Sequence, residues 1–120
     1  QISSPTSTSF LAKTCWNIVK KKSVGRIVPS IVHCSNSGVA SWYDLAEAVT
    51  QISLEIGLIS NAVKIIPIKS SQFFTKAERP SFSVLDCSES FSSLSQSSVH
   101  WRQELEKLLL FKSRAISIEK

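Results

Sequence analysis

Three segments of the chain carry apolar residues at the three- or four-residue spacing of amphipathic helices. They cover about residues 7–22, 41–56 and 100–111. The second begins at Ser41, where a hydroxyl followed three positions later by Asp44 has the arrangement of a capping box, and it stops before Gly57. A weaker helix is expected within residues 88–98. The tryptophans fall on these helices at positions that suit core packing: Trp16, Trp42 and Trp101.

Three other segments have the β-branched composition or the alternation of short strands. Residues 31–34 are the clearest strand, and residues 82–86 form a second one. Residues 63–69 contain Pro67, which confines a strand there to an edge or a bulge. Helices interspersed with strands predict an α/β fold. The tail, residues 112–120, is expected to be loosely held.

Length and cysteine usage narrow the class of protein. A chain of 120 residues matches one domain. Because it begins with Gln1 and contains no methionine, we expect it to be part of a longer protein. No apolar run approaches the roughly 20 residues of a membrane helix, so we expect no membrane partner. The three cysteines are widely spaced, which predicts reduced thiols in a cytoplasmic protein rather than disulfides or a zinc site.

The net charge of +5 raises the question of a nucleic-acid partner. The only basic run is Lys20–Lys22, which lies at the expected end of the first helix. Cations there complement the carbonyl end of the helix dipole. We favour this structural interpretation over a phosphate-binding patch, and we expect no nucleic-acid partner.

Motifs for cofactor binding and catalysis are missing. The three glycines lie far apart, so neither a dinucleotide loop nor a P-loop can form: Gly25, Gly38 and Gly57. The only tyrosine, Tyr43, is followed four positions later by Glu47, not by the lysine of a Tyr-x-x-x-Lys pair. Neither His33 nor His100 has a cysteine or serine at a spacing that indicates a catalytic nucleophile. We therefore predict no catalytic, cofactor-binding or metal-binding residue in this chain.

Arg79 stands directly before Pro80, which restricts the backbone on both sides of the pair. A guanidinium held at the entrance of the strand 82–86 suits carboxylate or phosphate, because its planar fork makes two parallel hydrogen bonds. The alternative is a solvated arginine beside Glu78, a kind of surface pair that contributes little.

Four blocks of sequence occur in a recognisable order: SSPTSTSFLA, HCSNSGVASWYDLAEAV, KAERPSFSVLDCS and HWRQELEKLL. They resemble the C-terminal part of the dTDP-4-dehydrorhamnose reductase family, which are extended short-chain reductases. The resemblance covers residues 1–111. It implies the fold of the C-terminal substrate lobe, with the strand 31–34 completing the Rossmann sheet of a separate N-terminal nucleotide-binding domain.

The resemblance also implies a function. Members of the family use NADPH to convert dTDP-4-dehydro-L-rhamnose to dTDP-L-rhamnose, and the N-terminal domain carries the NADPH site and the catalytic tyrosine and lysine. This chain would contribute binding of the dTDP-sugar and would have no reductase activity alone. An alternative is a non-catalytic regulatory or interaction module, since a regulatory subunit of methionine adenosyltransferase shares this fold.

Four site residues follow from the resemblance. Arg79 occupies the family's Arg-Pro position and would hold the diphosphate, an orienting role. Phe74, Asn36 and Ser37 would line the substrate pocket. Two positions depart from the family. Ser3 replaces a glycine that is usual in the family. Phe111 stands where some relatives carry a glutamate that binds a metal in the dimer, so no metal site is expected. A homodimer remains an open alternative.

Overall fold

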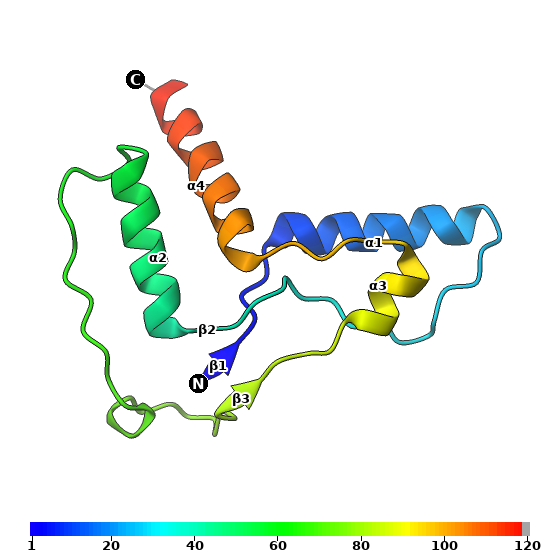
Figure 1. Cartoon of the computed structure of the whole chain (residues 1–120), viewed down its shortest axis with the longest axis horizontal. Helices are drawn as coiled ribbons and strands as arrows, with labels where there is room; N and C mark the ends of the chain where they lie inside the picture. Colours follow the sequence, from blue (N-terminus) through cyan, green and yellow to red (C-terminus); the bar gives the residue numbers. More distant parts are fainter. Residues whose placement is uncertain (119–120) are drawn as a thin grey trace.

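The structure, a computed structural model, describes residues 1–118 and has the predicted mixed α/β architecture. The helices are α1 (Thr8–Ser23), α2 (Trp42–Glu55), α3 (Ser88–Leu94) and α4 (Trp101–Ile118), with a 3-10 turn η1 at Ser70–Gln72. The strands are β1 (Ile2–Ser3), β2 (Ala40–Ser41) and β3 (Phe82–Ser83). Helix α2 lies beside α4, and α3 lies beside α1 (Figure 1).

The three short strands form one sheet with β1 in the middle. β1 pairs antiparallel with β2, where Ile2 faces Ser41, and parallel with β3, where Ile2 faces Phe82. The sheet therefore joins the start of the chain to the segment before α2 and to the segment before α3. It brings three distant parts of the sequence to one place.

Local capping explains where the first two helices begin. Ser7 has an extended backbone, and its Oγ accepts a hydrogen bond from Phe10 N at 3.0 Å. At the start of α2, Asp44 N donates to Ser41 Oγ at 3.1 Å and Ser41 N donates to Asp44 Oδ2 at 2.7 Å. The predicted capping box is therefore confirmed. Helix α2 ends before Gly57, whose φ of +69° suits a glycine.

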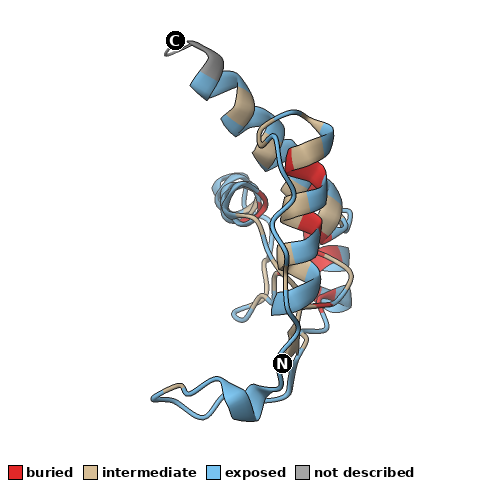
Figure 2. Cartoon of the chain, turned by 90° about the vertical axis from the view of Figure 1, so that its left-hand side faces the viewer, coloured by how far each residue is buried: buried red, intermediate tan, exposed pale blue. Residues whose placement is uncertain are grey.

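The core consists of two small apolar clusters. Between α1 and α3, Phe10 and Phe91 meet edge to face with ring centroids 5.9 Å apart, and Cys87 packs with them. Between α2 and α4, Ala48 and Trp101 pack together with Ala40. In Figure 2 the buried residues lie on the inner faces of the helices.

Several expected boundaries were wrong, but the strand at residues 31–34 stays a prediction, since it was expected to complete a sheet in a separate N-terminal domain. Within the described residues the segment has no neighbouring strand, and its backbone is held by a hydrogen bond from His33 N to Ser90 Oγ at 2.9 Å. Residues 63–69 are also irregular, and only Phe82–Ser83 of residues 82–86 pair. The last helix runs through Ile118, past the expected start of a loose tail at 112. Residues 119–120 of that tail lie outside the described part.

The prediction that all three tryptophans pack in the core was also wrong. Trp101 is 7% exposed, but Trp16 is 61% and Trp42 66% exposed. Trp16 lies on the side of α1 opposite the buried Phe10 and Thr14, and Leu11 and Val19 are exposed with it. Large apolar side chains of α1 therefore lie on a side that nothing described in this chain covers.

The molecule is correspondingly open. Its radius of gyration is 17.4 Å, whereas a compact domain of this length has about 14 Å. The molecule is 52 Å long and only 23 Å thick. Thin, open packing leaves apolar surface available for further contacts.

Candidate functional site

Asn36 connects three segments of the chain at the start of α1. Its Oδ1 accepts a hydrogen bond from Ser7 N at 2.9 Å, and its Nδ2 donates to Val99 O at 3.1 Å. Its own backbone N donates to Thr6 Oγ1 at 3.2 Å. Only 1% of Asn36 is exposed. The side chain therefore shapes the turn around it and offers little surface to a ligand.

Ser37 and Gly38 continue this turn against the start of α4. Ser37 N donates to Val99 O at 2.9 Å, and Trp101 N donates to Ser37 O at 3.0 Å. Gly38 has φ +83°, and a Cβ there would lie 2.9 Å from Trp101 Cδ1 and 2.3 Å from His100 Nε2. Only glycine suits this backbone and this close approach. The hydroxyl of Ser37 makes no hydrogen bond within the described residues.

Glu104 closes the same region from α4. Its Oε2 accepts from Ser7 Oγ at 2.8 Å and from Ser9 Oγ at 3.3 Å, and its Oε1 pairs with Lys107 Nζ at 2.8 Å. The carboxylate is buried beside the N-terminus of α1, where the helix dipole favours negative charge. The hydrogen bond from Lys107, followed by that from Ser7, holds the pKa of Glu104 below its ordinary value despite the opposing effect of burial.

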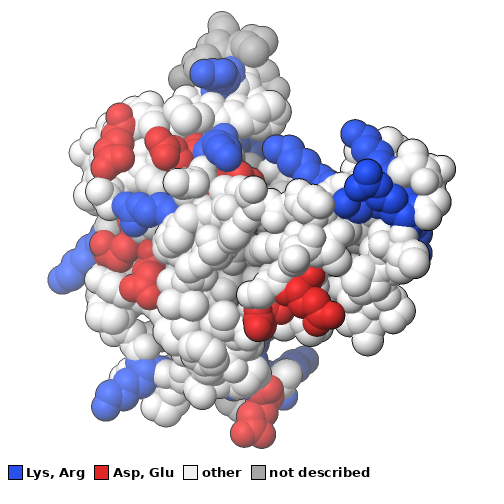
Figure 3. All heavy atoms as spheres, turned by 45° about the vertical axis from the view of Figure 1, so that its right-hand side comes forward, with Lys and Arg blue, Asp and Glu red and all other residues white. Residues whose placement is uncertain are grey.

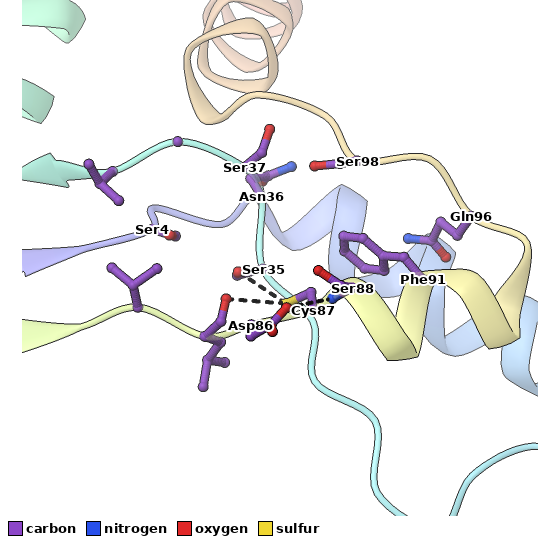
Figure 4. Close-up of a pocket in the computed structure, with 14 residues that line it drawn as sticks. Ser4, Ser35, Asn36, Ser37, Asp86, Cys87, Ser88, Phe91, Gln96 and Ser98 are labelled. Carbon is purple, nitrogen blue, oxygen red and sulfur yellow. Dashed lines mark hydrogen bonds between the residues drawn. The ribbon is translucent and has the colours of Figure 1, made fainter.

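A hollow of about 380 Å³ opens beside this turn (Figure 4). One wall is the turn 35–39 and the other is the segment 84–88, which follows β3. Phe91 of α3 contributes to the lining, as do Ser4 and Ser98. Of the four site residues expected from the sequence, Asn36 and Ser37 line this hollow.

Arg79 and Phe74 lie elsewhere, on the loop between α2 and β3. Phe74 is 92% exposed, and Arg79 is exposed as well. Arg79 makes no ion pair or hydrogen bond with the described residues, and this includes its neighbour Glu78. Figure 2 shows the loop reaching away from the rest of the molecule. The structure therefore brings Asn36 and Ser37 together but leaves Arg79 and Phe74 outside the hollow.

One charged residue of the hollow, Asp86, was not among the site residues expected from the sequence. Its Oδ1 accepts a hydrogen bond from Ser88 N at 2.9 Å, at the start of α3. Hydrogen bonds from the side chain and backbone of Ser88 lower the pKa of Asp86, so the group is charged at neutral pH. The signal in the sequence was its place at the end of the expected strand 82–86, where the chain leaves the strand and polar residues often line a site.

Within residues 1–118, no group of three or more histidine, cysteine, aspartate or glutamate residues could hold a metal ion. None of the helices there is long and apolar enough to cross a membrane.

Known proteins match the chain over nearly its whole length. The family model described as the RmlD substrate binding domain matches residues 1–112. The spore coat polysaccharide biosynthesis protein SpsK of Bacillus subtilis is 32% identical over 96% of this chain and 36% of its own length. The dTDP-4-dehydrorhamnose reductase of Mycolicibacterium smegmatis is 31% identical over 88% of this chain and 30% of its own.

A solved structure agrees with the fold. The crystal structure of a dTDP-4-dehydrorhamnose reductase from Clostridium acetobutylicum superposes with a TM-score of 0.75 and 25% identity, covering 94% of this chain and 36% of the other. The chain thus spans about a third of the length of the relatives it matches.

Proposed function

Because the chain belongs to the RmlD substrate-binding domain family, we propose that it binds the sugar nucleotide in an NADPH-dependent reductase that converts dTDP-4-dehydro-L-rhamnose to dTDP-L-rhamnose. The family match over residues 1–112 carries this proposal. Relatives named dTDP-4-dehydrorhamnose reductase support the substrate, and the three free thiols support a cytoplasmic location.

NADPH would be held by a separate N-terminal domain and not by this chain. A pyrophosphate site needs glycines in a loop that leads into a helix N-terminus. Gly25 and Gly57 instead follow the C-terminal ends of α1 and α2, and Gly38 packs against Trp101. The residues present therefore do not fit the cofactor. We expect no NADPH oxidation by the 120-residue chain with a dTDP-4-dehydro sugar. Measurable turnover would contradict the assignment of the NADPH site to the N-terminal domain.

The uncovered face of α1 is the surface we assign to this N-terminal domain. Trp16 and Val19 lie there, and Ile31, in the segment expected to complete the Rossmann sheet, is exposed as well. Covering large apolar side chains stabilises an interface by about 25 cal/mol per Å². The same face would also suit a separate partner chain, as the alternative of a non-catalytic interaction module requires. Binding of a partner without any affinity for dTDP-sugars would favour that alternative.

Arg79 would hold the diphosphate. Its guanidinium is exposed and unpaired within the described residues, so it is available to an anionic ligand. Losing charge-assisted hydrogen bonds costs about 1.5–3 kcal/mol, and Arg79→Ala should therefore weaken dTDP-sugar affinity roughly 10- to 100-fold. Arg79→Lys should recover only part of this loss, because an ammonium keeps the charge without the planar fork.

The experiment is titration of the dTDP-sugar by calorimetry into the protein that also carries the nucleotide-binding part. Lys76→Ala is the matched control, since Lys76 is an exposed cation on the same loop. NADPH affinity should stay the same in every variant. Equal dTDP-sugar affinities for wild type, Arg79→Ala and Lys76→Ala would show that Arg79 is a solvated surface arginine and does not hold the diphosphate.

A further inference from the structure

The far end of α1 carries positive charge that no acidic side chain neutralises. The last turn of the helix contains Lys20, Lys21 and Lys22, and Arg26 follows in the next segment. In Figure 3 basic side chains gather at this end of α1. Within the described residues, no carboxylate forms an ion pair with any of these four cations. They are therefore available to the carboxylate groups of a partner.

Ser23, the last residue of α1, lies among these cations. It is exposed, and its Oγ donates a hydrogen bond to Lys20 O at 2.9 Å. Three lysines directly precede it, and Val24, which is 71% exposed, follows it. No other serine in the sequence directly follows three cations. This is the charge pattern that basic-directed serine kinases bind, because carboxylates in their substrate groove contact the cations before the serine.

The segment after Ser23 is loosely held. Gly25 follows the helix with φ +73°, and nothing lies within 4 Å of its Cβ position. Residues 27–32 make no hydrogen bond with any other residue that the structure describes, and Ile27 is 96% exposed. Figure 1 shows the end of α1 and this segment at one edge of the molecule, away from the sheet. Because helix ends fray and exposed loops admit enzymes, residues 20–26 can extend into the groove of a kinase.

We propose that Ser23 is a phosphorylation site for a serine kinase that recognises basic residues. The Ser23 hydroxyl oxygen attacks the γ-phosphorus of ATP, the bond from that phosphorus to the β-phosphate oxygen breaks, ADP leaves, and the hydroxyl proton passes to the catalytic base of the kinase. Neither this step nor its test depends on the proposed substrate of the reductase.

The phosphate changes the charge at the end of α1. It adds about −1.5 to −2 charges at neutral pH and so cancels about half of the charge of the four cations. The carbonyl end of the helix dipole disfavours an anion. Lys20 offsets this effect, since it lies three residues earlier on the same side of the helix and can donate charge-assisted hydrogen bonds to the phosphate. Phosphorylation would therefore weaken any attraction of anionic partners to this end of the molecule.

Treatment of the 120-residue chain with the catalytic subunit of cyclic-AMP-dependent protein kinase, a kinase of this class, and Mg·ATP tests the site. Mass spectrometry should show one added phosphate, placed on Ser23 by peptide mapping. Ser23→Ala should abolish the incorporation. Ser98→Ala should not, because Ser98 is exposed but has no cation in the three positions before it.

A synthetic peptide of residues 17–27 is the positive control for the sequence pattern. If the peptide is phosphorylated and the folded chain is not, the fold withholds Ser23 and the proposal is wrong. If neither is phosphorylated, or if the phosphate lies on another serine, the proposal is also wrong. The proposed function stands in each of these cases.

Two lysines of α1 provide a matched test of recognition. Lys20 precedes Ser23 by three positions, whereas Lys13 is an exposed cation of the same helix that lies ten positions before it. Losing a charge-assisted hydrogen bond to the kinase should lower kcat/KM for phosphorylation of Lys20→Ala roughly 10- to 100-fold. Lys13→Ala should leave it unchanged. Alanine is the best helix former, so both variants should keep α1. Equal values of kcat/KM for the two variants would overturn the proposal.

Discussion

The turn around Asn36 and the loop of residues 60–80 each carry two of the four expected site residues, but they are held very differently. Asn36 and Ser37 bind Ser7, Val99 and Trp101, which are far from them in sequence. Residues 60–80, with Phe74 and Arg79, make hydrogen bonds only among themselves. Side chains of the turn are thus largely used by the fold, whereas those of the loop remain available to a ligand. A motif can mark a binding region without telling which of its residues touch the substrate.

The strongest test of the turn is Asn36→Ala. The substitution leaves Ser7 N without its partner and removes one of the two hydrogen bonds that Val99 O accepts. An unpaired group costs about 1–3 kcal/mol and a lost hydrogen bond about 0.5–1.5 kcal/mol. We expect the free energy of unfolding to fall by about 2–5 kcal/mol, measured by urea denaturation. A loss below about 0.5 kcal/mol, typical of surface positions, would mean that the turn is no better held than the loop.

Gly38→Ala should be the next most damaging change. Positive φ costs an alanine about 1–2 kcal/mol, and contact with the buried Trp101 adds overpacking of about 1–3 kcal/mol. Exposed His100 can rotate away from the new methyl group, but Trp101 cannot. Gly25→Ala is the control, since its φ is +73° and nothing lies within 4 Å of its Cβ position. Thermal unfolding should show a clearly larger decrease in the free energy of unfolding for Gly38→Ala than for Gly25→Ala. Equal decreases would mean that contact with Trp101 adds nothing to the cost.

Glu104→Gln should lower the free energy of unfolding by a smaller amount, and this decrease should depend on pH. Loss of charge-assisted bonds to Ser7 and Lys107 should cost about 1–2 kcal/mol at neutral pH. Because the folded-state pKa of Glu104 lies below its ordinary value of 4.5, its stabilisation is present above that value and is lost as pH falls through the folded-state pKa. The difference in the free energy of unfolding between wild type and Glu104→Gln should therefore become smaller at acidic pH. Glu106→Gln, at an exposed position of the same helix, should show no such dependence.

Phe74→Ala in the loop should change stability least. Since the ring is 92% exposed, the free energy of unfolding should stay within about 0.5 kcal/mol of wild type. Chemical denaturation of the chain without ligand measures this. A loss above 1 kcal/mol, the usual effect of a packed residue, would show that the loop contributes to the fold as the turn does.

The elements that could be predicted from sequence are those determined by near neighbours. Ser7, Ser41 and Asp44 cap their helices through bonds three residues away, so helix starts were visible in the pattern. Residues 31–34 have the composition of a strand, but a strand also requires a neighbour, which composition cannot supply.

The hollow and the exposed tryptophans depend on contacts between distant segments. Asp86 became part of the hollow because β3 pairs with β1, and Trp16 is exposed because nothing described in this chain covers that side of α1. Helical spacing identifies an apolar face but does not identify what packs on it. The resemblance to a family suggested site residues, and only the arrangement in space separated those that line the hollow from those on the loop.

The central position of β1 also has a consequence during synthesis on the ribosome. Ile2 pairs in parallel with Phe82, 80 positions later. At roughly 5–20 residues per second, the first strand waits on the order of 4–16 seconds for its second neighbour. During that time its hydrogen-bonding groups on one side and the apolar face of α1 that later packs on α3 are open to chaperones and to other nascent chains. Slowing translation between α2 and β3 would therefore lengthen the interval in which this chain is most prone to aggregate.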